Sequence, residues 1–323
     1  MKESKVEGQK SDINALLTCD FRPSTIIFTM RYDLCLPWYW EYDDVFVNMV
    51  ERACIEEGIS LWQIKPDNLL ESITALYKGV TTFKTLLHRG QGEAIFEPIP
   101  RWAQEFGVRR INPAEVSAWS EDKATMHLEL ITAGLNTPYT ILLPPFLEQP
   151  VAPHIDLSPL GENFVIKPSN GGGGEGVILG ANTLEQILHA RMEFPEQKYL
   201  IQAHVNPQVI EDAPAWFRIF YANGETYPCW WDTETHIYTR VTAEEEARFG
   251  LSRLRDVTMR IASICKLDWF STEIAFADDF VVVDYVNDEI DTRVQSQAMD
   301  GVPDEIMECV ARQLVKIAKE NAG

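Results

Sequence analysis

Two lysines, an arginine and several acidic residues are the groups in this 323-residue sequence that could do chemistry. Lys167 ends a short apolar run and precedes four consecutive glycines, Gly171, Gly172, Gly173 and Gly174. Consecutive glycines accept positive φ and let backbone N–H groups approach a ligand without interference from a Cβ atom. Such N–H groups beside a lysine can hold a polyphosphate. The stretch therefore predicts a phosphate-binding loop.

The apolar segments on both sides of this loop favour that interpretation over a flexible linker. Residues 164–166 and 177–179 are apolar and rich in β-branched side chains. This pattern predicts a hairpin that carries the glycines at its tip. A linker would normally be surrounded by serine or proline instead.

Lys123 is the second candidate for a phosphate contact. The sequence predicts a helix that begins after a Ser120 cap, runs to Ala133 and ends at Gly134. A lysine in the first turn lies at the positive end of the helix dipole, which is unfavourable for a cation. A neighbouring nucleotide would explain this position, and an ordinary surface lysine is the alternative.

Acidic residues within two apolar strands predict a metal site. Glu273 lies in the predicted strand 269–276, and Asp284 lies in the predicted strand 280–286, with Asn287 shortly after it. A carboxylate in an apolar strand is costly unless it is paired or binds a ligand. Three oxygen ligands at one hairpin end would suit Mg²⁺, with Mn²⁺ as an alternative. The other acids of this region are interpreted as a solvated loop: Asp278, Asp279 and Asp288.

Arg218 lies in the middle of a third predicted strand. Residues 215–221 and 225–231 read as two strands joined by Asn223-Gly224, a strong hairpin signal because both residues accept positive φ. The guanidinium fork suits two roles, structural pairing with a carboxylate or contact with a phosphate. Both interpretations stay open at this point.

Alternating strands and helices organise the first third of the chain. Strands are predicted at 24–30, 59–64 and 80–87, and helices at 45–57 and 67–78. This order predicts a small open α/β sheet with ligand sites at its strand ends. Segment 31–44 is predicted to be a loop, and its aromatic residues either pack beneath that loop or form a substrate-facing wall.

The remaining elements follow from caps and turn signals. Thr242 and Glu245 form a capping box at the start of one long predicted helix, 242–266. The other predicted elements are a helix near 98–106, a strand at 108–111, a helix after Pro113, a strand at 139–143, a helix at 183–194, a strand at 199–201 and a helix at 303–320.

Composition excludes several classes of function. The formal charge of −21, without a basic stripe, argues against nucleic acid as the main partner. No apolar run approaches the ~18 residues that cross a membrane. The polar N-terminus does not resemble a signal peptide, and residues 1–20 are predicted to be disordered. Six scattered cysteines without a C-x-x-C pair then predict a reducing, cytoplasmic location.

Four motifs, in this order, resemble the ATP-grasp superfamily over residues 119–300. They are D-K-x-x-x-x-x-x-L-x-x-A-G-L-x-T-P from Asp122, F-V-I-K-P-S-x-G-G-G-G-E-G-V from Phe164, Y-L-I-Q-A-H-V-N from Tyr199, and the acidic strand pair. The superfamily includes D-alanine–D-alanine ligase-like and ribosomal-modification-type carboxylate–amine ligases.

The resemblance implies an α/β (α+β) fold of three parts. Residues 1–118 would form a Rossmann-like pre-ATP-grasp domain. Residues 119–205 would form the central ATP-grasp subdomain with the glycine lid, and residues 206–323 the C-terminal subdomain with the metal site. The two α+β subdomains would clamp the nucleotide between them.

The same resemblance implies roles for individual residues. Lys123 and Lys167 would reach the nucleotide phosphates, and Arg218 would touch phosphate and the reacting carboxylate. Arg293 lies where related enzymes bind the acceptor. Adenine would be held by Ala203 C=O and Val205 N–H, after Gln202 in place of the usual glutamate, and ribose by Glu211 or Asp212. The metal ligands would be Glu273, Asp284 and Asn287, although the Asp284-x-x-Asn287 spacing is one residue longer than usual.

The resemblance finally implies an ATP- and Mg²⁺-dependent ligase. It would activate a small-molecule carboxylate as an acyl phosphate, which an amine or another nucleophile then attacks. One alternative is a kinase of a small hydroxyl compound, with Asp291 as general base. The other is a non-catalytic ATP-binding regulatory protein, which is supported by Gln202 and by the long spacing between Asp284 and Asn287. A homodimer is a further open expectation.

Overall fold

The chain forms two compact units in a computed structural model that describes residues 30–90, 92–151 and 154–323. One unit comprises the described residues up to Ile111 together with Met307–Gly323, and the other comprises Asn112–Ile306. The segment predicted to be disordered lies outside the described residues, as does all but the last residue of the predicted strand 24–30. The mixed α/β class is confirmed, because both units combine sheets with helices.

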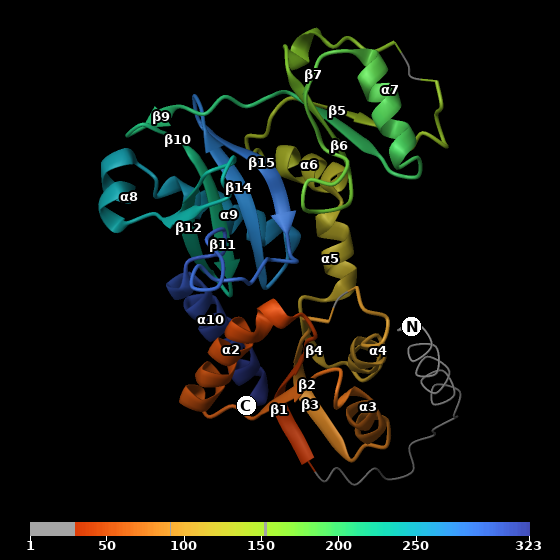
Figure 1. The fold of residues 1–323 in the computed structure, drawn as a ribbon, viewed down its shortest axis with the longest axis vertical. Helices are drawn as coiled ribbons and strands as arrows, with labels where there is room; N and C mark the ends of the chain where they lie inside the picture. Colours follow the sequence, from red (N-terminus) through yellow and green to blue (C-terminus); the bar gives the residue numbers. More distant parts are fainter. Residues whose placement is uncertain (1–29, 91, 152–153) are drawn as a thin grey trace. The chain divides into compact units, whose positions relative to one another are not determined.

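The N-terminal unit contains a four-stranded parallel sheet in the order β2-β1-β3-β4. Its elements are β1 (Met30–Pro37), η1 (Glu41–Asp43), α2 (Asp44–Glu57), β2 (Leu61–Ile64), α3 (Leu69–Tyr77), β3 (Thr81–Leu87), α4 (Pro98–Glu105), β4 (Arg109–Ile111) and most of α10 (Asp304–Ala322). Connections between parallel strands are right-handed, so the reversal of direction after β2 puts α2 on one face of the sheet and α3 and α4 on the other (Figure 1).

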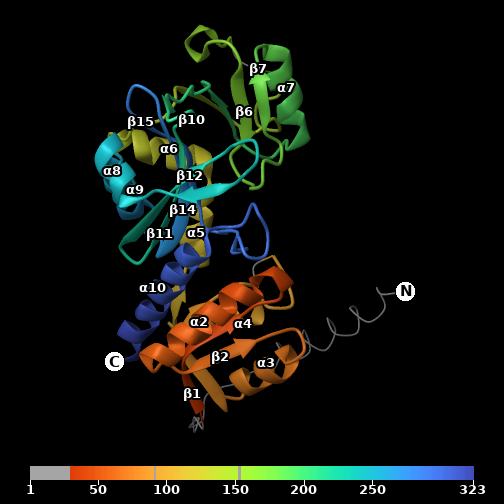
Figure 2. The same ribbon diagram turned by 60° about the vertical axis from the view of Figure 1, so that its left-hand side comes forward.

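Helix α10 completes this unit from the far end of the chain. It runs beside α2 (Figure 2), where Lys319 pairs with Glu57 at 2.6 Å. Lys84 Nζ on β3 donates to the Ala322 carbonyl at 2.7 Å, and Asn321 Nδ2 donates to the Lys84 carbonyl at 2.9 Å. The last turn of α10 is therefore fastened to a central strand of the sheet.

The first strand corrects the loop predicted over 31–44. β1 covers residues 31–37 of that segment, and it pairs with β2 on one side and β3 on the other. Leu34, Cys35 and Leu36 are fully buried. The polar Arg31 and Asp33 at the beginning of the strand obscure this pattern, because a central parallel strand is enclosed on both faces only where helices cover it.

The second unit begins with two helices and a four-stranded antiparallel sheet. Its elements are α5 (Ala114–Glu121), α6 (Lys123–Thr132), β5 (Thr140–Leu143), η2 (Ser158–Leu160), β6 (Phe164–Pro168), β7 (Ile178–Ala181), α7 (Leu184–Glu193) and β8 (Tyr199–Gln202). The strand order is β5-β8-β6-β7. The predicted glycine hairpin is confirmed as β6 and β7.

The two faces of this sheet have different partners. Ile166, Tyr199 and Ile201 pack in a core with residues of α7. Side chains alternate along a strand, and cross-strand partners share a face. Lys167 is paired with Leu200, and Val165 with Gln202. Lys167 and Gln202 therefore lie together on the face opposite α7.

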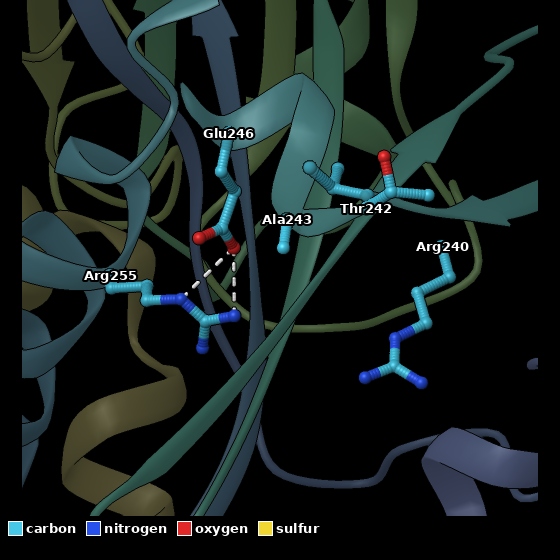
Figure 3. Close-up of a pocket in the computed structure, with 6 residues that line it drawn as sticks. Arg240, Thr242, Ala243, Glu246 and Arg255 are labelled. Atoms are coloured by element: carbon cyan, nitrogen blue, oxygen red, sulfur yellow. Dashed lines mark hydrogen bonds and ion pairs between the residues drawn. The ribbon is translucent and has the colours of Figure 1, made fainter. Parts of the chain in front are cut away.

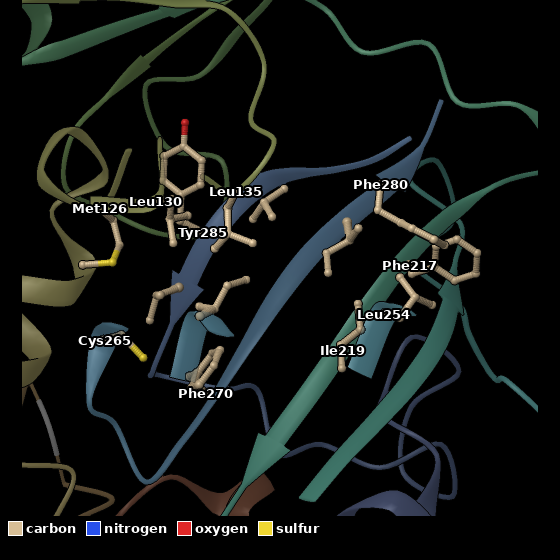
Figure 4. Close-up of a cluster of buried hydrophobic side chains, with 14 of the residues drawn as sticks. Met126, Leu130, Leu135, Phe217, Ile219, Leu254, Cys265, Phe270, Phe280 and Tyr285 are labelled. Atoms are coloured by element: carbon tan, nitrogen blue, oxygen red, sulfur yellow. The ribbon is translucent and has the colours of Figure 1, made fainter. Parts of the chain in front are cut away.

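A five-stranded antiparallel sheet follows, in the order β13-β12-β11-β14-β15. The elements of this part are β9 (Val209–Ile210), β10 (Ala213–Pro214), β11 (Trp216–Ala222), β12 (Glu225–Trp231), β13 (Tyr238–Arg240), α8 (Ala243–Phe249), α9 (Arg253–Cys265), β14 (Trp269–Phe276) and β15 (Phe280–Asn287). Phe217, Ile219 and Phe270 meet Leu254 of α9 in a core without exposed surface (Figure 4).

One predicted helix, 242–266, is in fact two. The capping box is confirmed, since Thr242 N–H donates to Glu245 Oε2 at 2.7 Å and Glu245 N–H donates to Thr242 Oγ1 at 3.2 Å. Gly250, however, is left-handed (φ 69°) and ends α8. Leu251 then turns into the core, where it is fully buried. Periodicity alone does not reveal this break, because glycine tolerates both conformations.

Two further expectations concern membrane-spanning segments and the cysteines. Among the described residues, no helix is long and apolar enough to span a membrane. The cysteines at 35, 54, 229, 265 and 309 carry free thiols.

A buried ion pair in the N-terminal unit yields a stability prediction. Arg89 Nη2 lies 3.0 Å from Asp43 Oδ1, and the aspartate is only 1% exposed. Arg89→Met should lower the free energy of unfolding by about 3–5 kcal/mol, because it removes a cation that stabilises the buried Asp43 carboxylate. Urea denaturation measures this change. As a control, Arg312→Met removes the exposed 3.8 Å pair with Glu56 and should cost no more than about 0.5 kcal/mol. Equal losses in the two variants would contradict the prediction.

Candidate functional site

Lys167 is almost entirely buried, with 6% of its surface exposed. Its ammonium donates to the Val283 carbonyl at 3.1 Å and lies 3.8 Å from Asp284 Oδ1. It also lies 5.4 Å from the centre of the Tyr285 ring. Burial lowers the pKa of Lys167, while the nearby Asp284 carboxylate opposes that change. Strand β15 thus surrounds this charge with a carbonyl, a carboxylate and an aromatic ring.

Glu273 and Asp284 face each other across β14 and β15. A bulge follows Ser271 in this pairing and aligns the two carboxyl groups. Burial raises the pKa of Glu273 to about 7. Burial would also raise the pKa of Asp284, but Lys167 holds it below its usual value. The two acids therefore differ in their tendency to be ionised, although they are neighbours.

Arg218 on β11 balances the charge of Glu273. Its Nη1 donates to Glu273 Oε1 at 2.8 Å, and its Nε and Nη2 donate to Ser271 Oγ at 3.2 and 3.0 Å. The guanidinium lies 5.7 Å from the Trp231 ring. Burial would lower the pKa of Arg218, yet Glu273 raises it above its usual value. Structural pairing with a carboxylate, one of the two predicted roles, is therefore observed.

Lys123 is the first residue of α6 and reaches the glycine loop. Its N–H donates to the Ser169 carbonyl at 2.8 Å, and its Nζ donates to the Gly171 carbonyl at 2.6 Å. The predicted cap is wrong: Asp122, not Ser120, caps α6 by accepting from Thr125 N–H at 2.8 Å. The Asp122 carboxylate stabilises the N-terminus of α6. The Lys123 ammonium beside it stabilises the glycine loop through the Gly171 carbonyl.

The glycine loop adopts conformations that other residues avoid. Gly171, Gly173 and Gly174 have φ of 107°, 61° and 78°. A Cβ atom at any of the four glycines, Gly172 included, would meet nothing within 4 Å. Backbone conformation, rather than crowding, therefore favours glycine at positions 171, 173 and 174. All four glycines are also exposed, so the loop is open to solvent.

The two lysines, Arg218 and the two carboxylates form one electrostatic cluster. Asp284 and Lys123 both act on the pKa of Lys167, and Arg218 and Lys123 both act on that of Asp284. Residues from α6, β6, β11, β14 and β15 thus meet in one place. Its alternating charges suit a ligand that carries several negative groups with a cation.

The protein side chains of this cluster supply only part of the ligand shell that a divalent cation needs. Among the described residues, no group of three or more His, Cys, Asp or Glu side chains could hold a metal. Glu273 and Asp284 supply two carboxylates, and Asn287 is paired with Ser271 further along the same two strands. Mg²⁺ commonly takes one or two carboxylates and completes its shell with water and phosphate oxygens. The donor set therefore fits Mg²⁺ bound together with a nucleotide.

Gln202 ends β8 and is 2% exposed. Its Nε2 donates to the Tyr285 hydroxyl at 2.8 Å and to Thr140 Oγ1 at 3.3 Å. Ala203 follows and donates its N–H to the Tyr139 carbonyl at 2.8 Å. Val205 lies beyond it in a segment without regular secondary structure. The adenine contacts predicted for Ala203 and Val205 stay predictions.

Tyr285 and His127 were not predicted from the sequence. The Tyr285 hydroxyl lies 2.7 Å from His127 Nδ1 in the interior. A histidine four residues after Lys123 on a helix, and a tyrosine next to Asp284 in an apolar strand, were the signals present in the sequence. Neither residue type is diagnostic alone, because a buried tyrosine or histidine often serves only packing.

Glu211 and Asp212 form the tip of the short β9–β10 hairpin. Both have positive φ, 47° and 68°, as a two-residue type I′ turn requires. Glu211 is ion-paired with Arg248 of α8. Among the described residues, no hydrogen bond or ion pair connects Glu211 to the charged cluster. A ribose contact by either acid stays a prediction.

Arg293 is held between two aspartates. Its Nη2 lies 2.6 Å from Asp291 Oδ2 and 3.0 Å from Asp300 Oδ2. Hydrogen bonds to Asp291, strengthened by both negative charges, raise the pKa of Arg293. Its role in acceptor binding is not tested by this geometry.

Asp288 is not part of a solvated loop, which corrects its interpretation. It is only 7% exposed, and its Oδ1 has no hydrogen-bond partner among the described residues. Glu121, at the end of α5, lies against it. Burial, with the hydrogen bond and charge of Asp288, raises the pKa of Glu121 to about 9. Burial of the pair thus favours the neutral form of Glu121 beside Asp288.

The aromatic segment after β1 divides between the two predicted roles. Tyr32 stacks on Trp62 at 5.7 Å, as packing predicts. Tyr39, Trp40 and Tyr42 are exposed instead. They follow β1, at which the strand order of the parallel sheet reverses, and ligands of open α/β sheets bind outside such strand ends. A substrate-facing wall is therefore a proposal for these three residues only.

A pocket of about 320 Å³ lies elsewhere in the second unit (Figure 3). It is lined by Arg240, Val241, Thr242, Ala243, Glu246 and Arg255. Arg255 Nη2 and Glu246 Oε1 pair across it at 2.7 Å. None of these residues belongs to the charged cluster, so we base the function on the cluster.

Comparison with known proteins identifies the fold. No family model and no curated protein sequence matches the chain. The structure of D-alanine–D-alanine ligase from Bacillus anthracis complexed with ATP matches with a TM-score of 0.61 and 14% identity, over 90% of this chain and 99% of that chain. ATP-grasp ligase PsnB complexed with minimal precursor, Mg and ADP matches with a TM-score of 0.59 and 14% identity, over 89% and 98%.

A RimK domain ATP-grasp protein from Sphaerobacter thermophilus matches with a TM-score of 0.57 and 18% identity, over 86% of this chain and 97% of that chain. The present chain therefore has the ATP-grasp fold. The resemblance drawn from four sequence motifs is confirmed at the level of the fold.

The Glu121–Asp288 pair predicts a pH dependence of stability. A carboxyl whose pKa is raised by folding stabilises the protein below its unfolded pKa, and this contribution is lost as pH rises through the folded pKa. Glu121→Gln keeps a neutral group, so its stability relative to the wild type should increase from about pH 5 to about pH 9, the pKa of Glu121. Urea denaturation at several pH values measures this difference. Asp288→Asn removes the neighbouring carboxyl and should weaken the trend without abolishing it, because burial also raises the pKa of Glu121. A trend equally steep in the Asp288→Asn background would refute the pairing.

Proposed function

We propose that this chain, which has the ATP-grasp fold, is an ATP- and Mg²⁺-dependent ligase. It would activate a carboxylate as an acyl phosphate, which an amine or another nucleophile then attacks. The observation that carries this proposal is the charged cluster, in which the buried Lys167 and the partly buried Arg218 each hold a carboxylate, Asp284 at 3.8 Å and Glu273 at 2.8 Å. The ATP, ADP and Mg named for matching ligase structures support it.

Phosphoryl transfer moves negative charge between oxygens, and fixed cations lower its barrier. Lys123 and Lys167 would hold the phosphates, and Arg218 would hold the transferred group and the reacting carboxylate. Glu273, Asp284 and Asn287 would hold Mg²⁺, which supplies further charge neutralisation when bound. The three cationic side chains already lie in one cluster, on α6, β6 and β11, so they need not be gathered during the reaction.

The glycine loop would protect the activated carboxylate. Its backbone conformations are accessible to glycine, and Lys123 Nζ ties it to α6 through Gly171. Closure of such a loop excludes water, which would otherwise hydrolyse an acyl phosphate. Arg293 is the candidate acceptor-binding group, and the exposed aromatic residues after β1 are candidates for a further substrate contact.

The kinase alternative is less well supported. It would require Asp291 as a general base, yet both oxygens of Asp291 accept hydrogen bonds from Arg293 Nε, at 3.1 and 2.8 Å. Both oxygens are therefore already engaged by a guanidinium and are not free to take a proton from a substrate hydroxyl. The non-catalytic alternative is decided by the experiment that follows.

Hydroxylamine trapping tests the reaction. The protein is incubated with Mg²⁺, ATP, hydroxylamine and panels of small acids and precursor peptides. A hydroxamate formed with one acid, together with ADP, is the expected result and identifies the substrate. ADP release that depends on a hydroxyl compound, without hydroxamate, would support the kinase instead. Tight ATP binding without turnover on any panel would favour the regulatory protein.

Replacement of Lys167 measures its contribution to the rate of phosphoryl transfer. Lys167→Met should lower the rate of hydroxamate formation by about 10²- to 10³-fold, since it removes a preorganised charge from the transferred phosphate. Lys319→Met is the matched control, because Lys319 forms an exposed 2.6 Å pair with Glu57 in the N-terminal unit. The control should stay within about twofold, as expected for a surface pair. Thermal unfolding of both variants checks their fold, and a rate for Lys167→Met equal to that of the control would exclude the assigned role.

A further inference from the structure

A single buried hydroxyl joins three elements of the proposed nucleotide site. The Tyr285 hydroxyl on β15 lies 2.8 Å from Gln202 Nε2 on β8 and 2.7 Å from His127 Nδ1 on α6. The Tyr285 ring packs at the edge of the main core, and its hydroxyl points out of that core (Figure 4). All three side chains are buried. This polar chain is therefore shielded from water and held in one arrangement.

The direction of the hydrogen bonds in this polar chain follows from the Pro138 carbonyl group. The Thr140 hydroxyl lies 2.9 Å from the Pro138 carbonyl, which can only accept, so the hydroxyl proton points there. Thr140 Oγ1 must then accept from its other neighbour, at 3.3 Å, and that neighbour must be the Gln202 amide nitrogen. The orientation of the Gln202 amide is thereby fixed without reference to a ligand.

The remaining bonds follow in sequence. The Gln202 nitrogen gives one proton to Thr140 and the other to the Tyr285 oxygen. Thr140 also lies near the Tyr285 hydroxyl, but the shorter contact is to His127 Nδ1 at 2.7 Å. We assign the Tyr285 proton to this nitrogen, which is then unprotonated. Burial and the charge of Lys167 lower the pKa of His127, in agreement with a neutral ring. Both amide protons of Gln202 are used, and its carbonyl oxygen Oε1 is the group left to face a ligand.

Gln202 and Lys167 lie on the same face of the four-stranded sheet β5-β8-β6-β7. The cross-strand partner of Gln202 is Val165, two residues before Lys167 on β6. Two residues of a strand span about 6–7 Å. A nucleotide whose phosphates reach Lys167 can therefore place its base beside Gln202. This placement rests on the proposed function.

We infer that Tyr285 is a positioning residue that selects the nucleotide base through Gln202. Its hydroxyl holds the amide so that Oε1 faces the base as a hydrogen-bond acceptor. Adenine presents an amino donor at C6 to such an acceptor, whereas hypoxanthine and guanine present a carbonyl oxygen, which repels it. In this role Tyr285 itself touches no substrate.

Nucleotide binding by Tyr285→Phe tests the inference. The variant keeps the ring and removes the hydroxyl that fixes the amide. The ratio of Kd for ITP to Kd for ATP, measured by titration calorimetry with Mg²⁺, should fall by about 3- to 10-fold, the worth of one buried hydrogen bond. The wild-type protein should prefer ATP.

Tyr199→Phe is the matched control for stability. Tyr199 lies on the same strand as Gln202 and is as fully buried as Tyr285. Its hydroxyl donates to the Ala190 carbonyl at 2.6 Å. Its loss should lower the Tm as Tyr285→Phe does, yet leave the ratio for the two nucleotides unchanged. An unchanged ratio in Tyr285→Phe, or an equal change in both variants, would overturn the inference.

A ligand-free measurement tests the hydrogen-bond direction separately. In ¹⁵N-histidine spectra of the wild type, assigned with His127→Gln, the Nδ1 of His127 should be unprotonated. A protonated Nδ1 would reverse the chain of bonds and overturn the inference. An unprotonated Nδ1 in a protein that binds neither nucleotide would instead refute the proposed function, and base selection with it, while the bond direction stands.

Discussion

The second unit depends on the pairing of charges that its strands remove from water. Moving an ammonium or carboxylate into the interior costs several kcal/mol unless a partner and hydrogen bonds compensate. Lys167 of β6 is compensated by a carbonyl and a carboxylate of β15, and Glu273 of β14 by Arg218 of β11. The register of these strands is thus constrained by charge as well as by the apolar core, because a slip of one residue would turn each charge towards the wrong face.

The same pairs explain how such a site can exist before its substrates arrive. Under the proposed function, phosphate oxygens would take the place of Asp284 beside Lys167, and Mg²⁺ would take the place of the cations beside the carboxylates. Each buried group would then exchange one partner for another of the same sign, and none would be left alone. The polar chain through Tyr285 adds a fixed element, since its bonds run between uncharged groups that need no such exchange.

Local signals in the sequence predicted much of this arrangement. The glycine hairpin, the Asn223-Gly224 turn, the capping box at Thr242 and the acidic strands all depend on neighbours in the chain, and the structure contains them. What escaped prediction depends on distant partners. Asp288 reads as a loop acid until Glu121 is placed against it, and Tyr285 reads as a core residue until His127 and Gln202 meet its hydroxyl. The strand β1 was missed because its buried part is short and begins with charged residues.

The return of the chain end to the N-terminal unit sets an order for synthesis. The β1–β4 sheet is made first on the ribosome, but the helix that binds Lys84 and Glu57 belongs to Met307–Gly323. That helix emerges only after all of Asn112–Ile306 has been translated. N-terminal domains generally fold as they emerge, but this unit lacks the contacts of α10 until the end of translation. The second unit is in effect an insertion into the first, and it can fold while the first is still unfinished.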